Sequence, residues 1–545
     1  MKKFGIAIIM ALLTLSSSPS FACSGLLVGK KASIDGSVII SYAADSHNLY
    51  GEMYRWPAAQ WPVGAMLDIK EWDTGKPLGQ IKQVSETYSV LGNMNEYQVA
   101  ITETTFGGRE ELVNPEGIMD YGSLIYVALQ RSKSAREAIQ VMTSLVKEYG
   151  YYSSGESFSI ADKNEAWIME MLGKGKGNKG AVWVAIRIPD DCISAHANQS
   201  RIQQIPFADK ENCMYSPDVV SFAKEKGYYK GTDKDFSFQA TYCPYTSGGL
   251  RFCEARVWSF FKQYKDMKAY KALAMGDITQ KPMPLYIHPD RKLSVRDIQH
   301  MMRDHFEGTE MDMAKEPGAG PFKVPYRWRP LTYKVDGKTY LNERAIATQQ
   351  TGFVIVPQMR NWLPDEIGGI LWFGVDDANT TVFNPIYSSS LQVPKCYEVG
   401  NGDLYNFSWS SAFWIHNWVA NMAYNKYNYM IKDIRKVQNK LEDNYETAIP
   451  AIDKAAQTLY DKDPQEARKF LTWYSTSTAE SATKRWKKLG EYLIVKYIDG
   501  NIKKEENGKF KRNPYGVPAS PDQPGYDEDY YKKVVNQAGT LLELK

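Results

Sequence analysis

The sequence predicts an α+β protein built of packed layers, with a mainly helical C-terminal part. In the first 200 residues, pairs of strand-like segments are separated by helical segments, which favours packed layers over regular βαβ alternation. From about residue 408 the apolar spacing becomes helical and stays so to residue 497. A composition of 43% hydrophobic and 13% aromatic residues indicates a globular core. We expect one domain over residues 23–400 and a helical extension over 401–545.

The first 22 residues have the three parts of a secretory signal peptide. Lys2 and Lys3 form a basic start, an apolar run spans residues 5–15, and small residues lead up to Ala22. The run is too short to cross a membrane, and no later stretch has the 18 or more apolar residues of a spanning helix. The sequence therefore predicts an exported protein, periplasmic or secreted, whose mature chain begins at Cys23 and has no integral membrane segment.

Charge and cysteine content exclude several classes of protein. The formal net charge of +3 falls to +1 when residues 1–22 are removed, since they hold two lysines and no acidic residue. A near-neutral chain has no bulk attraction for nucleic acid. Six cysteines in a chain of this length are no disulfide framework, and their pairing stays open. Neither a CxxC nor an HExxH motif is present, so no metal site is predicted.

Individual elements of the first half follow from local pattern. A hairpin is expected at the start, with strands 25–28 and 38–42 around a turn centred on residues 34–36. Further along we expect two strands around a turn at Asn93, an amphipathic helical stretch over 121–150, a hairpin turning at 162–164 and a strand over 181–189.

The second half divides into three parts. Residues 285–345 are rich in Pro, Gly and charge, which indicates loops and short helices. Strand character returns over 351–359 and 368–375, and helices follow to residue 497. The Pro- and Asp-rich stretch 513–530 is expected to be irregular.

Cys23, at the predicted cleavage point, is either a lipid-anchoring residue or a residue that needs a free amino group. The preceding Ser20, Phe21 and Ala22 fit a lipidation site poorly, and a strand rather than a flexible tether follows. A thiol has an ordinary pKa of about 8.5 and needs a base, and an α-amine titrates at about 7.7–8.0. An N-terminal cysteine carries nucleophile and base on one residue. We therefore favour the nucleophile.

Asp45 is expected beside this cysteine. If the turn centres on residues 34–36, antiparallel counting places Cys23 opposite residues 46–48 and brings Asp45 back to the N-terminus. A carboxylate there can orient the α-amine and tune its pKa. The alternative for Asp45 is a strand-end capping residue.

Several segments together resemble the N-terminal-nucleophile cysteine dipeptidases, relatives of penicillin V acylase and bile salt hydrolase. They are "CSGLLVGKKASIDGS", "GNMNEYQVAITETTFGGR", "DYGSLIYVALQR", "ISAHANQSRI", "LRFCEARVW", "NERAIATQQTGF" and "ILWFGVDDANTT", spread over most of residues 23–390. The resemblance implies an Ntn-hydrolase αββα sandwich of two antiparallel sheets between helical layers. It also implies hydrolysis of short peptides without a metal or other cofactor.

The resemblance assigns roles residue by residue. Asn95 and Asn198 match positions that donate hydrogen bonds to the oxyanion, although Asn also favours turns. Arg251 matches an active-site arginine, with Arg256 as the fallback if the register is shifted; a structural salt bridge is the alternative. The relatives commonly have Arg three residues before the Asp, where this chain has Tyr42. Tyr42 is expected to donate a hydrogen bond in its place, unless a different arginine fills the space.

Substrate contacts are expected at four further positions, from sequence neighbourhood alone. Glu103 and Glu156 are candidates to hold a substrate ammonium, and Arg109 and Arg251 to hold a substrate carboxylate. The sequence thus predicts an exported cysteine dipeptidase that acts through a thioester. The alternatives are an amidase for N-acyl amino acids or conjugated bile acids, and a lipid-anchored binding protein without chemistry. Side-chain preference and homo-oligomer formation stay open.

Overall fold

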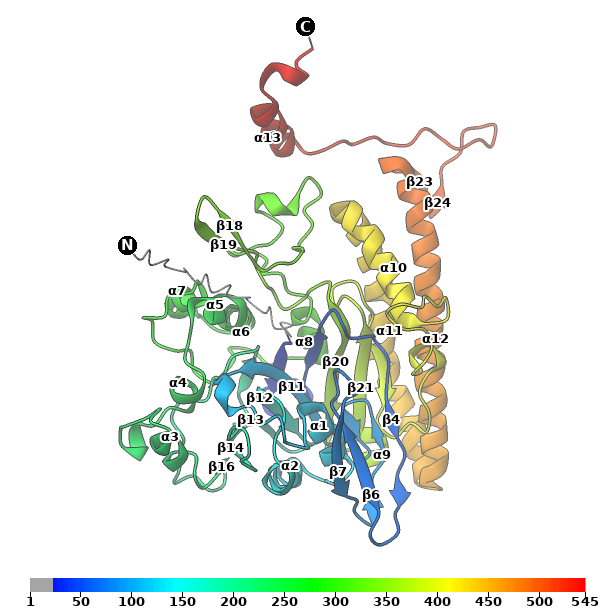
Figure 1. Ribbon diagram of the computed structural model, residues 1–545. Helices are drawn as coiled ribbons and strands as arrows, with labels where there is room; N and C mark the ends of the chain where they lie inside the picture. Colours follow the sequence, from blue (N-terminus) through cyan, green and yellow to red (C-terminus); the bar gives the residue numbers. More distant parts are fainter. Residues whose placement is uncertain (1–22, 545) are drawn as a thin grey trace, which may run out of the picture.

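The computed structural model describes residues 23–544, so the predicted signal peptide at 1–22 lies outside the described residues. Within this range two large antiparallel sheets form the centre of the molecule (Figure 1). In spatial order, the first sheet contains β17 (Tyr286–Ile287), β15 (Ile193–His196), β1 (Gly25–Val28), β2 (Val38–Ile40), β20 (Thr351–Met359), β21 (Gly369–Val375) and β22 (Asn384–Tyr387), with β3 (Tyr42–Asp45) also paired to β20.

The second sheet is built mainly from the segment between residues 90 and 215. In spatial order it contains β16 (Cys213–Tyr215), β14 (Ala181–Ile188), β13 (Ala166–Gly173), β12 (Gly155–Ala161), β11 (Ala100–Gly107), β10 (Met94–Asn95), β9 (Val90–Leu91) and β4 (Arg55–Trp56). The hairpin predicted to turn at 162–164 is β12–β13, and the predicted strand 181–189 is β14.

Three buried apolar clusters hold four layers together. One cluster joins Ile101 and Ile160 of the second sheet to the helices α1 (Tyr121–Leu129) and α2 (Ala135–Tyr149). Another lies between the sheets, where Leu27 and Ile40 meet the side chains of β13 and β14. The third lies between the far face of the first sheet and the helices that cover this face. The order is helices, sheet, sheet, helices, which confirms the predicted α+β class with antiparallel sheets.

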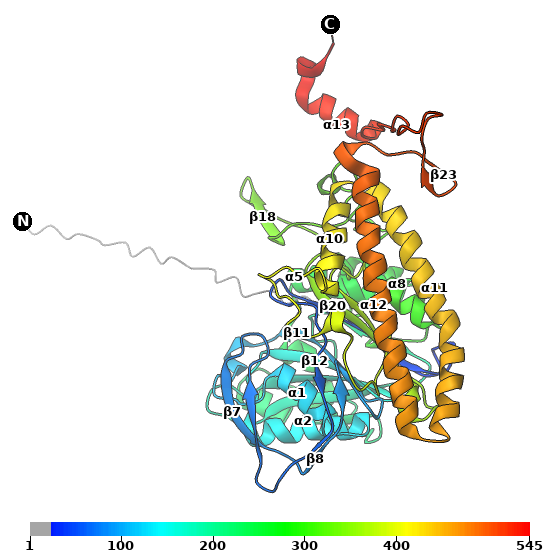
Figure 2. The same cartoon turned by 90° about the vertical axis from the view of Figure 1, so that its right-hand side faces the viewer.

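Helices from three parts of the chain cover that far face. They are α6 (Ala255–Lys262), α8 (Val295–Met301), α10 (Ala412–Asn425), α11 (Tyr427–Tyr460) and α12 (Pro464–Tyr497). Figure 2 shows α11 and α12 running side by side along the sheets. Ile434 of α11 and Trp486 of α12 lie in the same buried cluster as Val354 and Trp372 of the sheet. The predicted helical C-terminal region is confirmed, and it shares its core with the first sheet.

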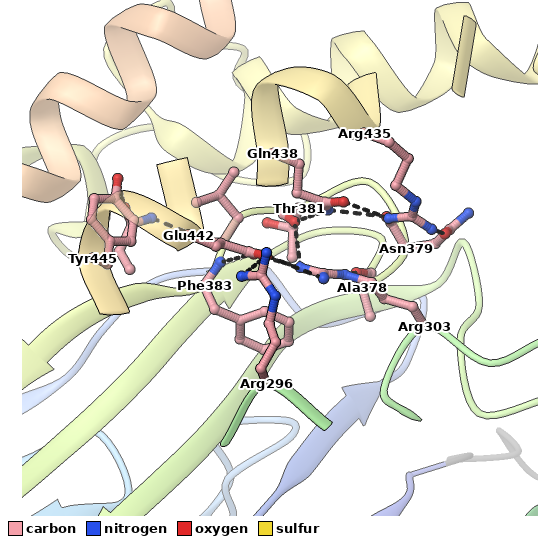
Figure 3. A network of polar contacts seen from close by, with 12 residues as sticks. Arg296, Arg303, Ala378, Asn379, Thr381, Phe383, Arg435, Gln438, Glu442 and Tyr445 are labelled. Atoms are coloured by element: carbon pink, nitrogen blue, oxygen red, sulfur yellow. Dashed lines mark hydrogen bonds and ion pairs between the residues drawn. The ribbon is translucent and has the colours of Figure 1, made fainter. Parts of the chain in front are cut away.

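A buried polar network fastens α11 to the sheet region (Figure 3). Glu442 of α11 accepts hydrogen bonds from Arg303 at 2.5 Å and from the backbone N–H of Phe383 at 3.0 Å. Arg296 of α8 lies 2.7 Å from the same carboxylate. Because Glu442 and Arg303 are almost fully buried, the charges compensate one another away from water.

One local prediction was incomplete and another was wrong. The helical stretch over 121–150 is two helices, because Ser134 accepts a hydrogen bond from the backbone of Glu137 and starts a second helix. The first hairpin pairs Leu27 with Ile40, so it centres between residues 33 and 34 and sets Cys23 opposite residue 44, not 46–48. The connection is a wide loop tied to its neighbours, since Gly29 donates a backbone hydrogen bond to Cys192.

The C-terminal end lies apart from the layers. Residues 513–527 contain no helix or strand, as predicted, but the last three residues of the predicted irregular stretch 513–530 begin α13 (Glu528–Ala538), which has no buried residue. It extends beyond the ends of α11 and α12 (Figures 1 and 2). In the loop-rich region 285–345, a hairpin of β18 (Thr332–Val335) and β19 (Lys338–Leu341) was not predicted. Across residues 23–544, no helix is both long enough and apolar enough to span a bilayer.

Candidate active site

Cys23 stands at the entrance to β1, in the interior of the molecule. Its side chain is 3% exposed, and Ser24 pairs with Ala43 of β3 in the neighbouring strand. Gly25 is the next residue, and its hydrogen faces the ring of His196 on β15: a Cβ there would lie 2.9 Å from the ring. Only glycine therefore lets β1 lie this close to β15 and carry Cys23 to the centre of the first sheet.

Tyr42 and Glu103 are the polar groups nearest the thiol. Sγ of Cys23 lies 3.7 Å from the Tyr42 hydroxyl and 3.7 Å from Oε1 of Glu103. Tyr42 donates a 2.5 Å hydrogen bond to the same Glu103 oxygen. Burial raises the pKa of the Cys23 thiol well above its usual value, and the negative charges of Glu103 and Asp45 raise it further. Burial and these charges therefore favour the protonated thiol over the thiolate.

Asp45 ends β3 and lies beside Cys23, as predicted. Its carboxylate accepts hydrogen bonds from Arg344 at 2.6 Å and from Thr351 at 2.6 Å. Burial raises the pKa of Asp45, while Arg344 and Thr351 favour the ionised form. Its backbone N–H also faces the Cys23 sulfur and lowers the thiol pKa. Arg344 is thus the arginine that holds Asp45 in this chain, whose position 42 is a tyrosine.

Arg256 on α6 holds the backbone of Cys23. Its guanidinium donates to the carbonyl oxygen of Cys23 at 2.5 Å and to Oγ of Ser24 at 2.8 Å. The other nitrogen donates to Oδ1 of Asn198 at 2.9 Å. Asn198, in the left-handed region at φ 61°, in turn donates to the carbonyl of Thr105 at 2.8 Å. Burial lowers the pKa of Arg256 to about 10, so it stays cationic near neutral pH.

Three of the predicted site residues lie in other environments. Arg251 points to the opposite side of its helix, where it pairs with Glu343, so the fallback Arg256 is the arginine beside Cys23. The predicted oxyanion role of Asn95 is wrong, because Nδ2 donates at 2.8 Å to the carbonyls of both Leu129 and Ser132 and both hydrogens are used.

Arg109 is likewise engaged away from the thiol. Its guanidinium lies 3.9 Å from the ring centre of Tyr228 and donates to the carbonyl of Thr241 at 2.9 Å. Among the described contacts it has none with Cys23 or its neighbours. The predicted role of Arg109 and Arg251 in holding a substrate carboxylate is therefore not supported by their positions.

Glu156 lies next to Glu103, as the strand register requires. Thr105 of β11 pairs with Glu156 of β12, so Glu103 and Glu156 are diagonal neighbours on one face of the sheet. Both carboxyls are almost fully buried, at 2% and 1% exposure. Burial raises the pKa of Glu103 to about 7, and burial together with the charge of Glu103 raises the pKa of Glu156 well above its usual range.

An aromatic cavity adjoins the site on the Tyr42 side. Its volume is about 50 Å³, and most of its walls are aromatic. The residues that line it include Tyr42, Trp56, Trp72, Tyr121, Tyr126, Phe353, Phe373 and Asn93. Cys23 does not line the cavity, but the Tyr42 side chain, whose hydroxyl lies 3.7 Å from Sγ of Cys23, forms part of its wall.

Sequence reasoning missed Arg344 and Thr351. Both belong to the segment "NERAIATQQTGF", so the motif was recognised although its contact with Asp45 was not. The available signal was the tyrosine at position 42, which left open that a different arginine fills the space. The six cysteines, all within the described residues, are free, so no disulfide restrains the site.

Comparison with known proteins places these residues in a family context. The sequence model of Peptidase family C69 matches residues 22–55 and 51–440. A "Probable dipeptidase" of Latilactobacillus sakei is 25% identical over 471 residues, covering 81% of this chain and 89% of its own. A "Probable dipeptidase" of Salmonella dublin is 27% identical, covering 71% and 85%. "Dipeptidase A" of Lactobacillus helveticus is 25% identical, covering 78% and 85%.

Proposed function

Because this chain belongs to peptidase family C69 and is a peptidase, we propose that it is an exported dipeptidase whose nucleophile is the N-terminal Cys23 of the mature chain. The relatives named as dipeptidases support the substrate class. The observation that carries the proposal is the setting of Cys23, a buried thiol whose backbone is held by Arg256 and whose neighbour Asp45 is held by Arg344. We further propose the Ntn-hydrolase type for the layered fold.

Removal of residues 1–22 frees the α-amine that the mechanism needs as its base. The amine takes the proton from Sγ while sulfur forms a bond to the scissile carbonyl carbon. The remaining Nδ2 hydrogen of Asn198 is available to the developing oxyanion. When the oxyanion collapses, the C–N bond breaks and the proton passes to the leaving amine. Water then adds to the thioester, releasing the acid and restoring the thiol.

Arg256 contributes orientation rather than proton transfer in this mechanism. Its bonds to the Cys23 carbonyl and to Asn198 fix the nucleophile and the oxyanion donor relative to one another. Such fixed geometry can supply a large part of the rate enhancement. The raised thiol pKa explains why the base is needed, since thiolate is scarce without it.

The first prediction tests the nucleophile and its amine. Cys23→Ala is expected to lower kcat/KM for a dipeptide at least about a thousandfold, because thiol and reacting geometry are lost together. A precursor whose cleavage after Ala22 is blocked should be equally inactive, because its amine is tied up in a peptide bond. Activity is measured on purified protein whose N-terminus has been established by intact mass.

Cys213→Ala is the matched control, since Cys213 is also a buried free cysteine but lies in β16 at the edge of the other sheet. It should keep activity within about twofold. Dipeptide turnover by Cys23→Ala, or by the uncleaved precursor, contradicts the mechanism. Preferential cleavage of an N-acyl amino acid or a bile-acid conjugate favours an amidase, and a diacylated Cys23 in the mass spectrum favours a lipid-anchored protein.

A further inference from the structure

We propose that Glu103 binds the α-ammonium group of the substrate, so that the enzyme acts on peptides with a free N-terminus and a single residue before the scissile bond. This inference rests on the proposed role of Cys23, because the position of the sulfur determines where the ammonium must lie. It concerns the recognition of the substrate rather than the reaction itself.

The reach of a dipeptide brings its ammonium to Glu103. In an attack geometry the scissile carbon lies about 3–3.5 Å from the nucleophile. Standard bond lengths place the α-nitrogen of the same residue about 2.5 Å from that carbon. The nitrogen therefore lies within about 6 Å of Sγ. Oε1 of Glu103 is 3.7 Å from Sγ, well inside this range.

Glu103 is also the acidic group near the thiol whose carboxyl has no cationic partner among the described residues. Asp45 already holds Arg344 and Thr351. Oε1 of Glu103 accepts from hydroxyl and thiol groups, and the Glu103 and Glu156 carboxyls share a hydrogen bond that favours ionised Glu103 and protonated Glu156; among the described residues no cation pairs with either of them. A buried carboxylate without a compensating charge is costly, so a cationic ligand gains from filling this place.

The pair Glu103–Glu156 matches a single positive charge. Two buried carboxyls this close do not both ionise readily, and Glu156 retains its proton more strongly. Above about pH 7, where Glu103 is ionised and Glu156 protonated, the pair therefore carries about one negative charge, which one ammonium neutralises. A second residue before the scissile bond would put an uncharged amide at this position and leave the carboxylate unpaired.

Binding of the ammonium also prepares the nucleophile. Because the negative charge of Glu103 raises the pKa of the Cys23 thiol, a cation beside Glu103 offsets that effect and makes the thiol easier to deprotonate. A peptide that lacks the ammonium then reacts more slowly even when it is bound. N-acetylation should lower kcat as well as raise KM.

The second prediction compares a free dipeptide with its N-acetyl form on the wild type and on Glu103→Gln. The wild type should prefer the free dipeptide at least tenfold in kcat/KM, which is about 1.4 kcal/mol. In Glu103→Gln that preference should fall below about threefold, mainly through the free dipeptide. Glutamine keeps an oxygen that can accept from Tyr42, so the tyrosine contact is retained.

Glu170→Gln is the matched control, since Glu170 is a fully buried carboxyl on β13 that bonds to Ser200 rather than to the thiol. It should keep the wild-type preference. If acetylated peptide turns over too slowly, calorimetry measures both ligands on Cys23→Ala, with and without Glu103→Gln. Equal losses for both ligands, or a wild type without preference, overturn the inference. Activity of Cys23→Ala instead overturns the proposed function.

Discussion

At the scale of single residues, the surroundings of Cys23 combine two opposite influences on its chemistry. Glu103 and Asp45 oppose ionisation of the thiol, while Arg256 and Arg344 hold the backbone and the carboxylate around it. Arg256 donates to the carbonyl of Cys23 and Arg344 to the carboxylate of Asp45, so both cations fix the groups around the thiol. Under the proposed mechanism the thiol needs a proton acceptor, and the charge of the ligand that enters the site changes the thiol pKa.

The third prediction concerns pH. The ratio of kcat/KM for free and N-acetyl dipeptide should fall as pH is lowered through about 7, because Glu103 gains a proton there and loses the charge that attracts the ammonium. The ratio should fall again above about 8, where the substrate amine is deprotonated. The titration of groups that both substrates need, such as the Cys23 amine, changes both kcat/KM values alike and cancels in the ratio.

The titratable groups that face Glu103 from its neighbours are Cys23, Tyr42, Asp73, Tyr121, Tyr151 and Glu156. Burial raises the pKa of the four that are tyrosine or cysteine, so they do not titrate near neutral pH. Burial raises the pKa of Asp73 to about 6, which adds to the change below 7. In Glu103→Gln the fall below about pH 7 should shrink to the smaller change that Asp73 contributes around pH 6; a wild-type ratio that is flat there contradicts the assignment.

At the scale of elements, α11 is fastened to the sheet by the charge network around Glu442 (Figure 3). Arg296 of α8 contacts Glu442 at 2.7 Å and also Asp443 at 2.9 Å. The Glu442 side chain is 1% exposed and that of Asp443 is 66% exposed. The two neighbouring residues thus bind one arginine in environments of very different polarity.

The fourth prediction uses this natural pair. Glu442→Gln should lower the free energy of unfolding by about 3 kcal/mol, because it leaves Arg303 and Arg296 without a compensating buried charge. Asp443→Asn should cost less than about 1 kcal/mol, as expected for a solvent-exposed ion pair. Urea unfolding measures both. Similar losses for the two variants would show that burial does not govern the strength of this network.

At the scale of the whole molecule, the C-terminal helices complete the layered core. Val354, Val356, Ile370 and Trp372 of the first sheet are nearly or fully buried in the cluster that α10, α11 and α12 help to form. By contrast, α13 contributes no buried residue. The chain beyond residue 401 therefore contains both an essential layer and a dispensable end.

The fifth prediction separates these two parts by truncation. A mature chain ending at residue 512 should remain folded and active, because it loses only exposed segments such as α13. A chain ending at residue 400 should fail to fold, because an apolar sheet face would meet water. Thermal unfolding and gel filtration measure both, and a cooperative, monomeric 23–400 fragment would contradict the prediction.

The sequence by itself determined the features that depend on local pattern. Strand and helix periodicity predicted β1, β12, β13, β20 and the helices after residue 408, because burial of one face imposes that spacing on the chain. The predicted return of the chain after the β1–β2 loop was enough to bring Asp45, at the end of β3, back to Cys23. The position of Cys23 at a predicted cleavage site pointed to a nucleophile before any fold was known.

Only the tertiary structure decided which distant side chains meet at Cys23. Arg344 reaches Asp45 from 299 positions away along the chain, and Arg256 rather than Arg251 binds the backbone carbonyl of Cys23. Asn95 turns its amide to the α1–α2 loop instead of the site. Which distant side chains meet depends on which face of a helix or strand packs inward. That direction is set by the pairing of whole sheets and helices rather than by neighbouring residues.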